Sequence, residues 1–209
     1  MGVFTNSIMK YMDQGGWIMW VLAAFSIAAL VVIIERGITF YKAKINTSEL
    51  LGKLRSALKK KNVKAAIEVC ESYRSPISAI LKSGLLKYGR PKDDIEKAME
   101  NAAVHELARM ERGLGILASV SNLAPMLGFL GTVVGMIASF DAMSKLNDPA
   151  KVAEGISTAL ITTAGGLIVA APVLLFYNYY TAKIGGFIRE IESASNVLVE
   201  TFGEIETIQ

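Results

Sequence analysis

Apolar residues form three uninterrupted stretches along the chain, and each is long enough to cross a lipid bilayer. A membrane-spanning helix needs about 20 apolar residues, and residues 14–34, 113–140 and 155–182 contain no charged side chain. Trp17 and Trp20 lie near one end of the first stretch, which is typical of an aromatic belt at a membrane surface. We therefore predict an all-α membrane protein with three transmembrane helices, the first of them an uncleaved anchor.

The segments outside these stretches have the spacing of water-exposed helices. Residues 35–112 are predicted to form a cytoplasmic helical domain, in which Asn46 and the pair Ser75-Pro76 mark helix starts. Residues 183–209 are predicted to form a cytoplasmic C-terminal helix that packs on other helices, because its apolar residues recur every three or four positions. These recurring residues are Ile184, Phe187, Ile191, Ala194, Leu198, Phe202 and Ile205.

Two further segments complete the expected organisation. Residues 1–13 have apolar side chains four apart and are interpreted as an amphipathic segment on the outer membrane surface, with a disordered leader as the alternative. Residues 141–154 are predicted to be a loop between the second and third spans. The apolar stripe that begins at Ile95 continues through Leu117, which predicts one unbroken helix from Asp94 to Phe140, about 70 Å long.

Positive charge is concentrated between the first two spans. Of the 22 Lys and Arg residues, 17 lie between Arg36 and Arg112, which places this region in the cytoplasm by the positive-inside rule. The N-terminus and the 141–154 loop are then outside, and the C-terminus is inside. The basic residues form no compact patch with interleaved aromatics, so nucleic acid is excluded as a partner.

The chain carries no pattern typical of an enzyme or of a metal or cofactor site. Its one cysteine, Cys70, cannot form an internal disulfide, and its one histidine, His105, cannot build a metal site alone. No phosphate-binding loop, zinc-protease motif or nucleophile elbow is present. We therefore expect neither catalysis nor a cofactor.

The second and third spans are unusually rich in small and hydroxyl residues. At helical spacing Ser121, Pro125, Gly128, Thr132, Gly135 and Ser139 share one face of the second span, and Ala159, Thr163, Gly166, Ala170 and Tyr177 form a stripe on the third, with Thr158 and Thr162 beside it. Small residues permit close helix packing, and hydroxyls can also line a water-contacting path. Both interpretations remain open from spacing alone.

Neither of these two spans contains a carboxylate, a histidine or a basic residue. A proton relay normally needs a titratable group. The chain can therefore line a proton path only if a second protein brings an acid against Thr132 and Thr163. Glu154, just before the third span, is either a collector of cations at the outer mouth or an ordinary interfacial charge.

At these residues the chain resembles the MotA/TolQ/ExbB proton-channel family, and its three spans are most similar to the ExbB/TolQ branch. The matching elements are Ala124-Pro125, Gly128, Leu130-Gly131-Thr132, Gly135, Gly155-Ile156, Ala159-Leu160, Thr163-Ala164, Gly166-Leu167, Pro172 and Tyr177-Asn178. The resemblance implies pore threonines at Thr132 and Thr163, and we expect the neighbouring Thr158 and Thr162 to line the same path. We expect helix packing through Pro125, Gly128, Gly131, Gly135, Gly166 and Pro172.

The same resemblance implies an assembly and a location. The chain would form a homopentamer in the bacterial inner membrane, with the 141–154 loop in the periplasm. The pentamer would enclose a dimer of an ExbD/TolR-like single-span protein that supplies an intramembrane Asp. The proton motive force would then drive work at the outer membrane or cell envelope, in some members through a TonB/TolA-like effector, as in biopolymer or protein transport.

One position departs from the family pattern. Many ExbB and TolQ members have Glu where this chain has Thr158, and the nearest acid is Glu154. Sodium coupling is therefore an alternative to proton coupling, because hydroxyl-rich walls also suit sodium. A non-conducting membrane scaffold, whose small-residue faces serve assembly alone, is the other alternative.

Overall fold

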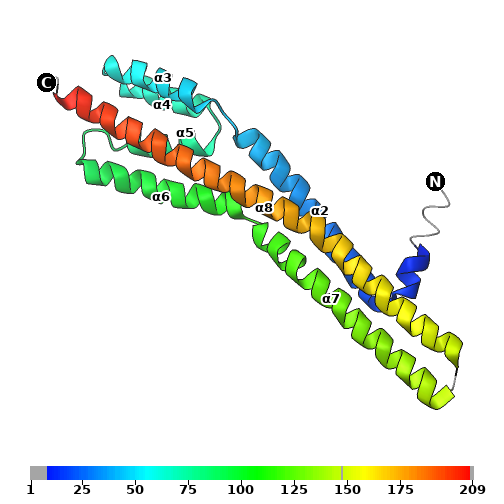
Figure 1. Ribbon diagram of the computed structural model, residues 1–209. Coiled ribbons are helices and arrows are strands. Elements are labelled where there is room, and N and C mark those ends of the chain that lie inside the picture. The colour runs from blue at the N-terminus through cyan, green and yellow to red at the C-terminus, as the bar shows by residue number, and fades with distance from the viewer. Residues whose placement is uncertain (1–8, 147, 208–209) are drawn as a thin grey trace. The chain divides into compact units, whose positions relative to one another are not determined.

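The structure is a computed structural model that describes residues 9–146 and 148–207, and the regular elements within those ranges are all helices. Besides a helical segment before Gly15, they are α2 (Gly16–Ala43), α3 (Thr47–Lys59), α4 (Val63–Ser72), α5 (Pro76–Leu85), α6 (Lys92–Glu111), α7 (Leu114–Asp141), a short π-helix η1 (Ala142–Leu146) and α8 (Pro149–Thr207) (Figure 1). Stretches long and apolar enough to cross a membrane occur in α2, α7 and α8. The prediction of an all-α protein with three such helices is confirmed.

Helix starts in the region between the first two apolar stretches follow the capping residues. The Asn46 side chain accepts a hydrogen bond from the Glu49 amide at the start of α3, 3.3 Å away. Ser75 and Ser78 form a reciprocal capping box at the start of α5, with Pro76 in the first turn. Both predicted starts are confirmed, because these side chains satisfy amides that the first helical turn leaves unpaired.

The predicted unbroken helix from Asp94 to Phe140 is wrong. Helix α6 ends at Glu111 and α7 begins at Leu114, because Gly113 adopts a left-handed backbone conformation with φ of 84°. Glycine takes this conformation without the steric cost of a Cβ, and it is the usual residue just past a helix end. The Arg36 side chain donates a hydrogen bond from Nη1 to the Arg109 carbonyl (3.0 Å), in the last turn of α6.

Two further predicted segments, the 141–154 loop and the N-terminal amphipathic segment, can be compared with the structure. The stretch 141–154, expected to be a loop, is largely helical, since η1 continues from α7 and α8 begins at Pro149. In the predicted N-terminal amphipathic segment, residues 9–13 are helical, and residues 1–8 lie outside the described part of the chain.

The chain divides into two compact units. The first, here called the apolar unit, comprises residues up to Ile34 together with Gly113–Tyr179; the second, called the charged unit, comprises Glu35–Arg112 together with the residues from Tyr180 onward. Helices α2 and α8 contribute to both units. Each unit is described separately below.

The charged unit is built around a conventional hydrophobic core. Its fully or almost fully buried side chains include Leu50, Leu54, Leu58, Ile77, Ile80, Leu81, Leu85, Met99, Ala194, Leu198 and Phe202. These residues come from α3, α5, α6 and the C-terminal part of α8. The prediction that the C-terminal helix packs through its recurring apolar residues is confirmed, because Ile191, Ala194 and Leu198 belong to this core.

The apolar unit has an apolar surface. One buried cluster of this unit contains Ile18, Leu22, Ala124 and Ala170. Large apolar side chains remain exposed on all three of its helices, among them Ile27, Leu30, Phe129, Ile137, Leu160 and Ile168. Such a surface is stable in contact with lipid, and soluble proteins rarely expose apolar patches of this extent.

Candidate functional site

Helices α7 and α8 pack closely along a line of small residues, here called the seam. A Cβ built on Gly166 would lie 2.5 Å from the Ala124 carbonyl oxygen, and one built on Gly135 would lie 2.6 Å from the Gly155 carbonyl oxygen. A Cβ on Gly128 would meet the Thr162 carbonyl oxygen at 3.0 Å. Each of these neighbours is backbone, so no side chain could fit without separating the helices.

The seam runs along a somewhat different face of α7 from the one that the sequence predicted. The buried residues of α7 are Leu114, Leu117, Val120, Ser121, Ala124, Gly128, Gly131, Gly135 and Ser139. Ala124 and Gly131 thus occupy positions that the prediction gave to Pro125 and Thr132, both of which are half-buried. Small residues at spacings of three and four, from Ala124 to Gly135, are the sequence signal for this seam.

Thr162 lies inside the seam. It has no exposed surface, and Gly131 is opposite it, where any side chain would collide with the Thr162 hydroxyl and Cβ. The hydroxyl donates to the carbonyls of Thr158 (3.0 Å) and Ala159 (2.9 Å) on its own helix. The structure therefore places Thr162 at a helix contact and not on a surface of the unit.

Thr132 and Thr163 lie next to the seam and on the same side of it. The contacts of Gly128 with Thr162 and of Gly135 with Gly155 show that α7 and α8 run antiparallel. In an antiparallel pair of right-handed helices, residues one position after the seam residues point to the same side, because each helix turns about 100° per residue. Thr132 follows Gly131, and Thr163 follows Thr162.

Both hydroxyls are half-buried and hydrogen-bonded to backbone. Thr163 donates to the Gly128 carbonyl of α7 (3.2 Å) and the Ala159 carbonyl of its own helix (3.1 Å). Thr132 donates to the Phe129 carbonyl (2.6 Å). One hydroxyl proton can satisfy only one acceptor at a time, and each oxygen keeps lone pairs that can accept a further hydrogen bond.

Helix α2 covers the opposite side of the seam. A Cβ on Gly165 would meet the Met19 sulfur at 2.8 Å, and Thr158 donates a hydrogen bond to the Gln14 carbonyl at 2.9 Å. Helical geometry puts Gly165 and Thr158 on the side away from Thr163. Of the four threonines predicted for one site, the structure brings Thr132 and Thr163 to one side, buries Thr162 and directs Thr158 towards the N-terminal segment.

The two prolines lie within the helices. Pro125 is inside α7 and Pro172 is inside α8. Because proline has no amide hydrogen, the carbonyls of Ser121 and Ile168, four residues earlier, lack their usual helical donor. Each proline therefore also locally weakens its helix, which adds to the packing role that the sequence predicted.

Charged side chains lie at the end of the seam that is close to η1. Ser139 donates hydrogen bonds to the carbonyls of Gly135 and Val152, both at 3.0 Å, and so joins α7 to the start of α8. A groove of about 580 Å³ beside it is lined by Asp141, Lys145, Lys151, Glu154 and Thr158, among others. Asp141 pairs with Lys145 at 3.1 Å, whereas Glu154 is exposed and makes no ion pair among the described residues.

Comparison with known proteins matches this chain to one family model. The family model described as the MotA/TolQ/ExbB proton channel family matches residues 72–193, which include most of both seam helices. The chain belongs to the MotA/TolQ/ExbB proton channel family. It is a multi-pass membrane protein of a family of transport and channel complex subunits, and it is related to energy-transducing subunits rather than to enzymes.

Proteins from several organisms align with most of this chain. An ExbB homolog of biopolymer transport from Methanothermobacter thermautotrophicus is 34% identical over 190 residues, which is 90% of this chain and 68% of the relative. An ExbB-like protein of Synechocystis is 27% identical over 93% of this chain and 91% of its own length. The Tol-Pal system protein TolQ of Pseudomonas aeruginosa is 28% identical over 79% of this chain and 78% of its own length.

Proposed function

We propose that this family member is the channel-wall subunit of a proton-driven motor in the bacterial inner membrane. The observation that carries the proposal is the position of Thr132 and Thr163, on the same side of the seam and on the side opposite α2. They are hydroxyls on an otherwise apolar face, where Phe129, Leu160 and Leu167 are exposed. Such a face suits contact with another helix and a few water molecules.

The absence of charge in the two seam helices defines what the subunit can contribute. Residues 113–140 and 155–182 contain no titratable carboxylate, histidine or lysine. The hydroxyls of Thr132 and Thr163 would accept and donate hydrogen bonds while an Asp of a partner helix takes up and releases the proton. The glycine seam would hold the two threonines in register, since it leaves the helices little freedom to slide.

The proposed assembly follows the ExbB and TolQ relatives. Five copies would surround an ExbD/TolR-like dimer, with Thr132 and Thr163 of each copy facing inward and α2 facing the lipid. Exposed apolar side chains on α2, such as Ile27 and Val31, agree with that assignment. Work at the cell envelope, as in biopolymer transport or through a TonB/TolA-like effector, would use the proton motive force.

The test is proton flux through the complex with its single-span partner. The two proteins would be co-expressed, reconstituted together in liposomes and assayed with an internal pH dye under an imposed proton gradient. Thr132→Ala and Thr163→Ala should each lower the flux at least about tenfold. This corresponds to an activation barrier that is higher by roughly 1.4 kcal/mol or more. Thr132→Ser and Thr163→Ser keep the hydroxyl and should retain most of the flux.

The matched control removes a hydroxyl from another face of α8. Ser157 is exposed and does not follow a seam residue, so Ser157→Ala should leave the flux unchanged. Size-exclusion chromatography of every variant must show the assembled complex. Normal flux in assembled Thr132→Ala and Thr163→Ala complexes would contradict the proposal.

The scaffold alternative is favoured by one observation, namely that both hydroxyls already have backbone acceptors within the chain. A scaffold predicts that polar-to-alanine changes are silent, whereas bulky seam substitutions break the oligomer. Sodium coupling predicts that flux in the same liposomes follows an imposed sodium gradient instead of a proton gradient.

A further inference from the structure

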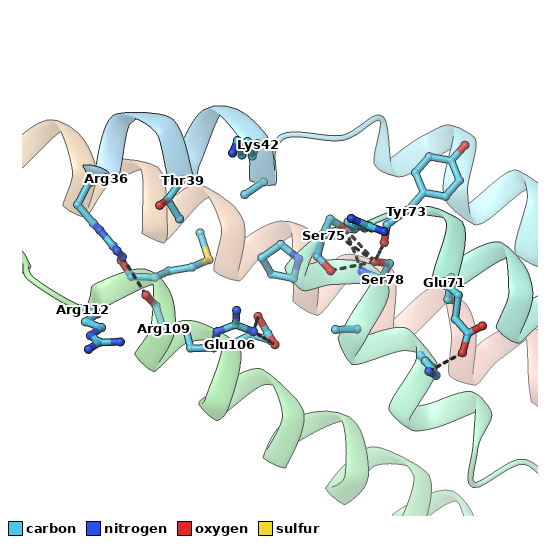
Figure 2. Close-up of a pocket in the computed structure, with 17 residues that line it drawn as sticks. Arg36, Thr39, Lys42, Glu71, Tyr73, Ser75, Ser78, Glu106, Arg109 and Arg112 are labelled. Atoms are coloured by element: carbon cyan, nitrogen blue, oxygen red, sulfur yellow. Dashed lines mark hydrogen bonds and ion pairs between the residues drawn. The ribbon is translucent and has the colours of Figure 1, made fainter. Parts of the chain in front are cut away.

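A large, mainly basic pocket lies within the charged unit. It has a volume of about 640 Å³ and is formed by α2, α4, α5 with the connection between them, and α6 (Figure 2). Six basic residues line it, against two acidic ones: Arg36, Lys42, Arg74, Lys82, Arg109 and Arg112 against Glu71 and Glu106. Figure 2 shows the Arg36 side chain reaching from α2 toward Arg109 on α6.

Half of these cations are not neutralised within the described chain. Lys82 pairs with Glu71 at 2.7 Å, Arg109 pairs with Glu106 at 3.1 Å, and Arg36 pairs with Glu35. The other three, which are Lys42, Arg74 and Arg112, form no ion pair among the described residues and are exposed at the rim. The pocket therefore retains a positive potential that favours an anion.

A buried donor adds to this positive character. Arg36 is 4% exposed, and although its Nη1 donates to the Arg109 and Met110 carbonyls, its buried Nε has no hydrogen-bond partner in the described structure. An unpaired buried donor is costly, and such exceptions call for a specific explanation, for example the binding of an anion. The ten-residue helix α5 also begins at this pocket, so its positive dipole end acts in the same direction.

We propose that this pocket binds the phosphate group of an anionic phospholipid. The chain position of the cations favours a lipid as the source of the phosphate. Arg36 follows Ile34, the last residue of the first apolar stretch, by two positions, and Arg112 directly precedes the second apolar stretch. Basic residues that close to membrane spans lie within reach of lipid head groups, and arginine forks match phosphate geometry. This site is separate from the proposed proton path.

The experiment measures lipid retention by the purified full-length protein. Native mass spectrometry in detergent would follow binding of dioleoylphosphatidylglycerol, with dioleoylphosphatidylcholine as the zwitterionic comparison. The wild-type protein should retain phosphatidylglycerol preferentially. The double variant Lys42→Gln/Arg74→Gln should bind it at least about tenfold more weakly, since each cation near an anionic head group contributes roughly fivefold.

The matched control is Lys64→Gln/Lys87→Gln, which removes the same charge from exposed positions that do not line the pocket. It should bind phosphatidylglycerol like the wild type. Equal retention of the two lipids, or an equal loss in the control, would overturn the proposal. A separate titration with inorganic phosphate distinguishes the source. Phosphate binding that the pocket variant alone abolishes, without phosphatidylglycerol retention, would assign the pocket to a soluble phosphate compound and overturn the lipid assignment.

Discussion

The helices of the two units pack through opposite kinds of residues. In the charged unit, large side chains such as Leu54, Leu81 and Leu198 are buried and charges cover the surface. In the apolar unit, the closest contacts are made by glycines, whereas large side chains such as Ile168 and Phe129 are exposed. The same helix, α8, takes part in both arrangements.

The difference follows from the solvent of each unit. In water, burial of apolar area is the main favourable term, so large side chains belong inside. In lipid that term is absent between helices, and close backbone approach through small residues provides the contact instead. Removing bulk should therefore damage the charged unit, and adding bulk should damage the apolar unit.

The largest effect is expected from removing bulk in the charged unit. Leu81 is fully buried, so Leu81→Ala should destabilise the protein by about 2–5 kcal/mol through lost burial and an unfilled cavity. Thermal unfolding of the detergent-solubilised chain would measure the loss. Leu86→Ala, at a 63% exposed position, and Ile168→Ala, at a 73% exposed position in the apolar unit, are the controls. Equal losses in all three would remove the distinction between the units.

The next prediction tests whether the charged unit's core excludes water. Burial raises the pKa of the Cys70 thiol to about 12, from an ordinary value of 9.0. At pH 8 its alkylation by iodoacetamide should be at least about a hundredfold slower than that of an exposed thiol, because the thiolate is the reactive form. Ser72→Cys in a Cys70→Ala background supplies the exposed reference. Comparable rates would mean that the core opens readily.

The same pKa shift determines how the folding stability changes with pH. An unfolded chain ionises this thiol near pH 9, whereas the folded chain keeps it neutral up to about pH 12. The folded state therefore loses stability as pH rises from about 9 to about 12. A Cys70→Ala variant should lack this contribution.

Adding bulk to the seam is expected to have the next largest effect. Gly166→Ala places a methyl group against the backbone of Ala124, which cannot move aside without separating α7 from α8, at a cost of about 1–3 kcal/mol. Gly186→Ala is the matched control on the same helix, because nothing lies within 4 Å of its added Cβ. That control should be neutral or slightly stabilising, since alanine favours helix more than glycine. Thermal unfolding in detergent measures both variants. Equal stability of Gly166→Ala and Gly186→Ala would contradict the close packing of α7 on α8.

The sequence predicts helix types and starts well, because these depend on local chemistry. Asn46 and Ser75 cap the helices that they were expected to cap, and the apolar stretches became α2, α7 and α8. The break at Gly113 was missed because a stripe with spacings of three and four can continue across a change in backbone direction. Gly113 directly follows Arg112 and comes four residues after Arg109, and this was the available signal, since basic residues followed by glycine are typical of a helix end.

The candidate site was predicted only in part. Residue spacing grouped Thr132 with the glycines, but the neighbouring Gly131 lies in the seam and Thr132 lies beside it. Spacing alone does not show which of two adjacent residues faces a partner helix, because they differ by about 100° and both are small or polar. Thr158 was grouped with the same site, although its hydroxyl bonds to the Gln14 carbonyl.

The smallest effect concerns how helices begin in the two units. In the charged unit, side chains cap α3, α4 and α5, whereas neither α6 of the same unit nor α7 of the apolar unit has a side-chain cap. The Asn62 side chain accepts a hydrogen bond from the Ala65 amide at 3.0 Å, so Asn62→Ala should cost about 1 kcal/mol.

The conservative variant and a distant control make this last effect specific to capping. Asn62→Asp keeps an acceptor for the Ala65 amide and should retain the stability. Asn101→Ala, at an exposed position inside α6, should be neutral or stabilising, because alanine is the better helix former there. Thermal unfolding that shows the same small loss for Asn62→Ala and Asn101→Ala would mean that the Asn62 cap contributes nothing. A loss confined to Asn62→Ala would show that α4 depends on the Asn62 side chain to satisfy its first turn.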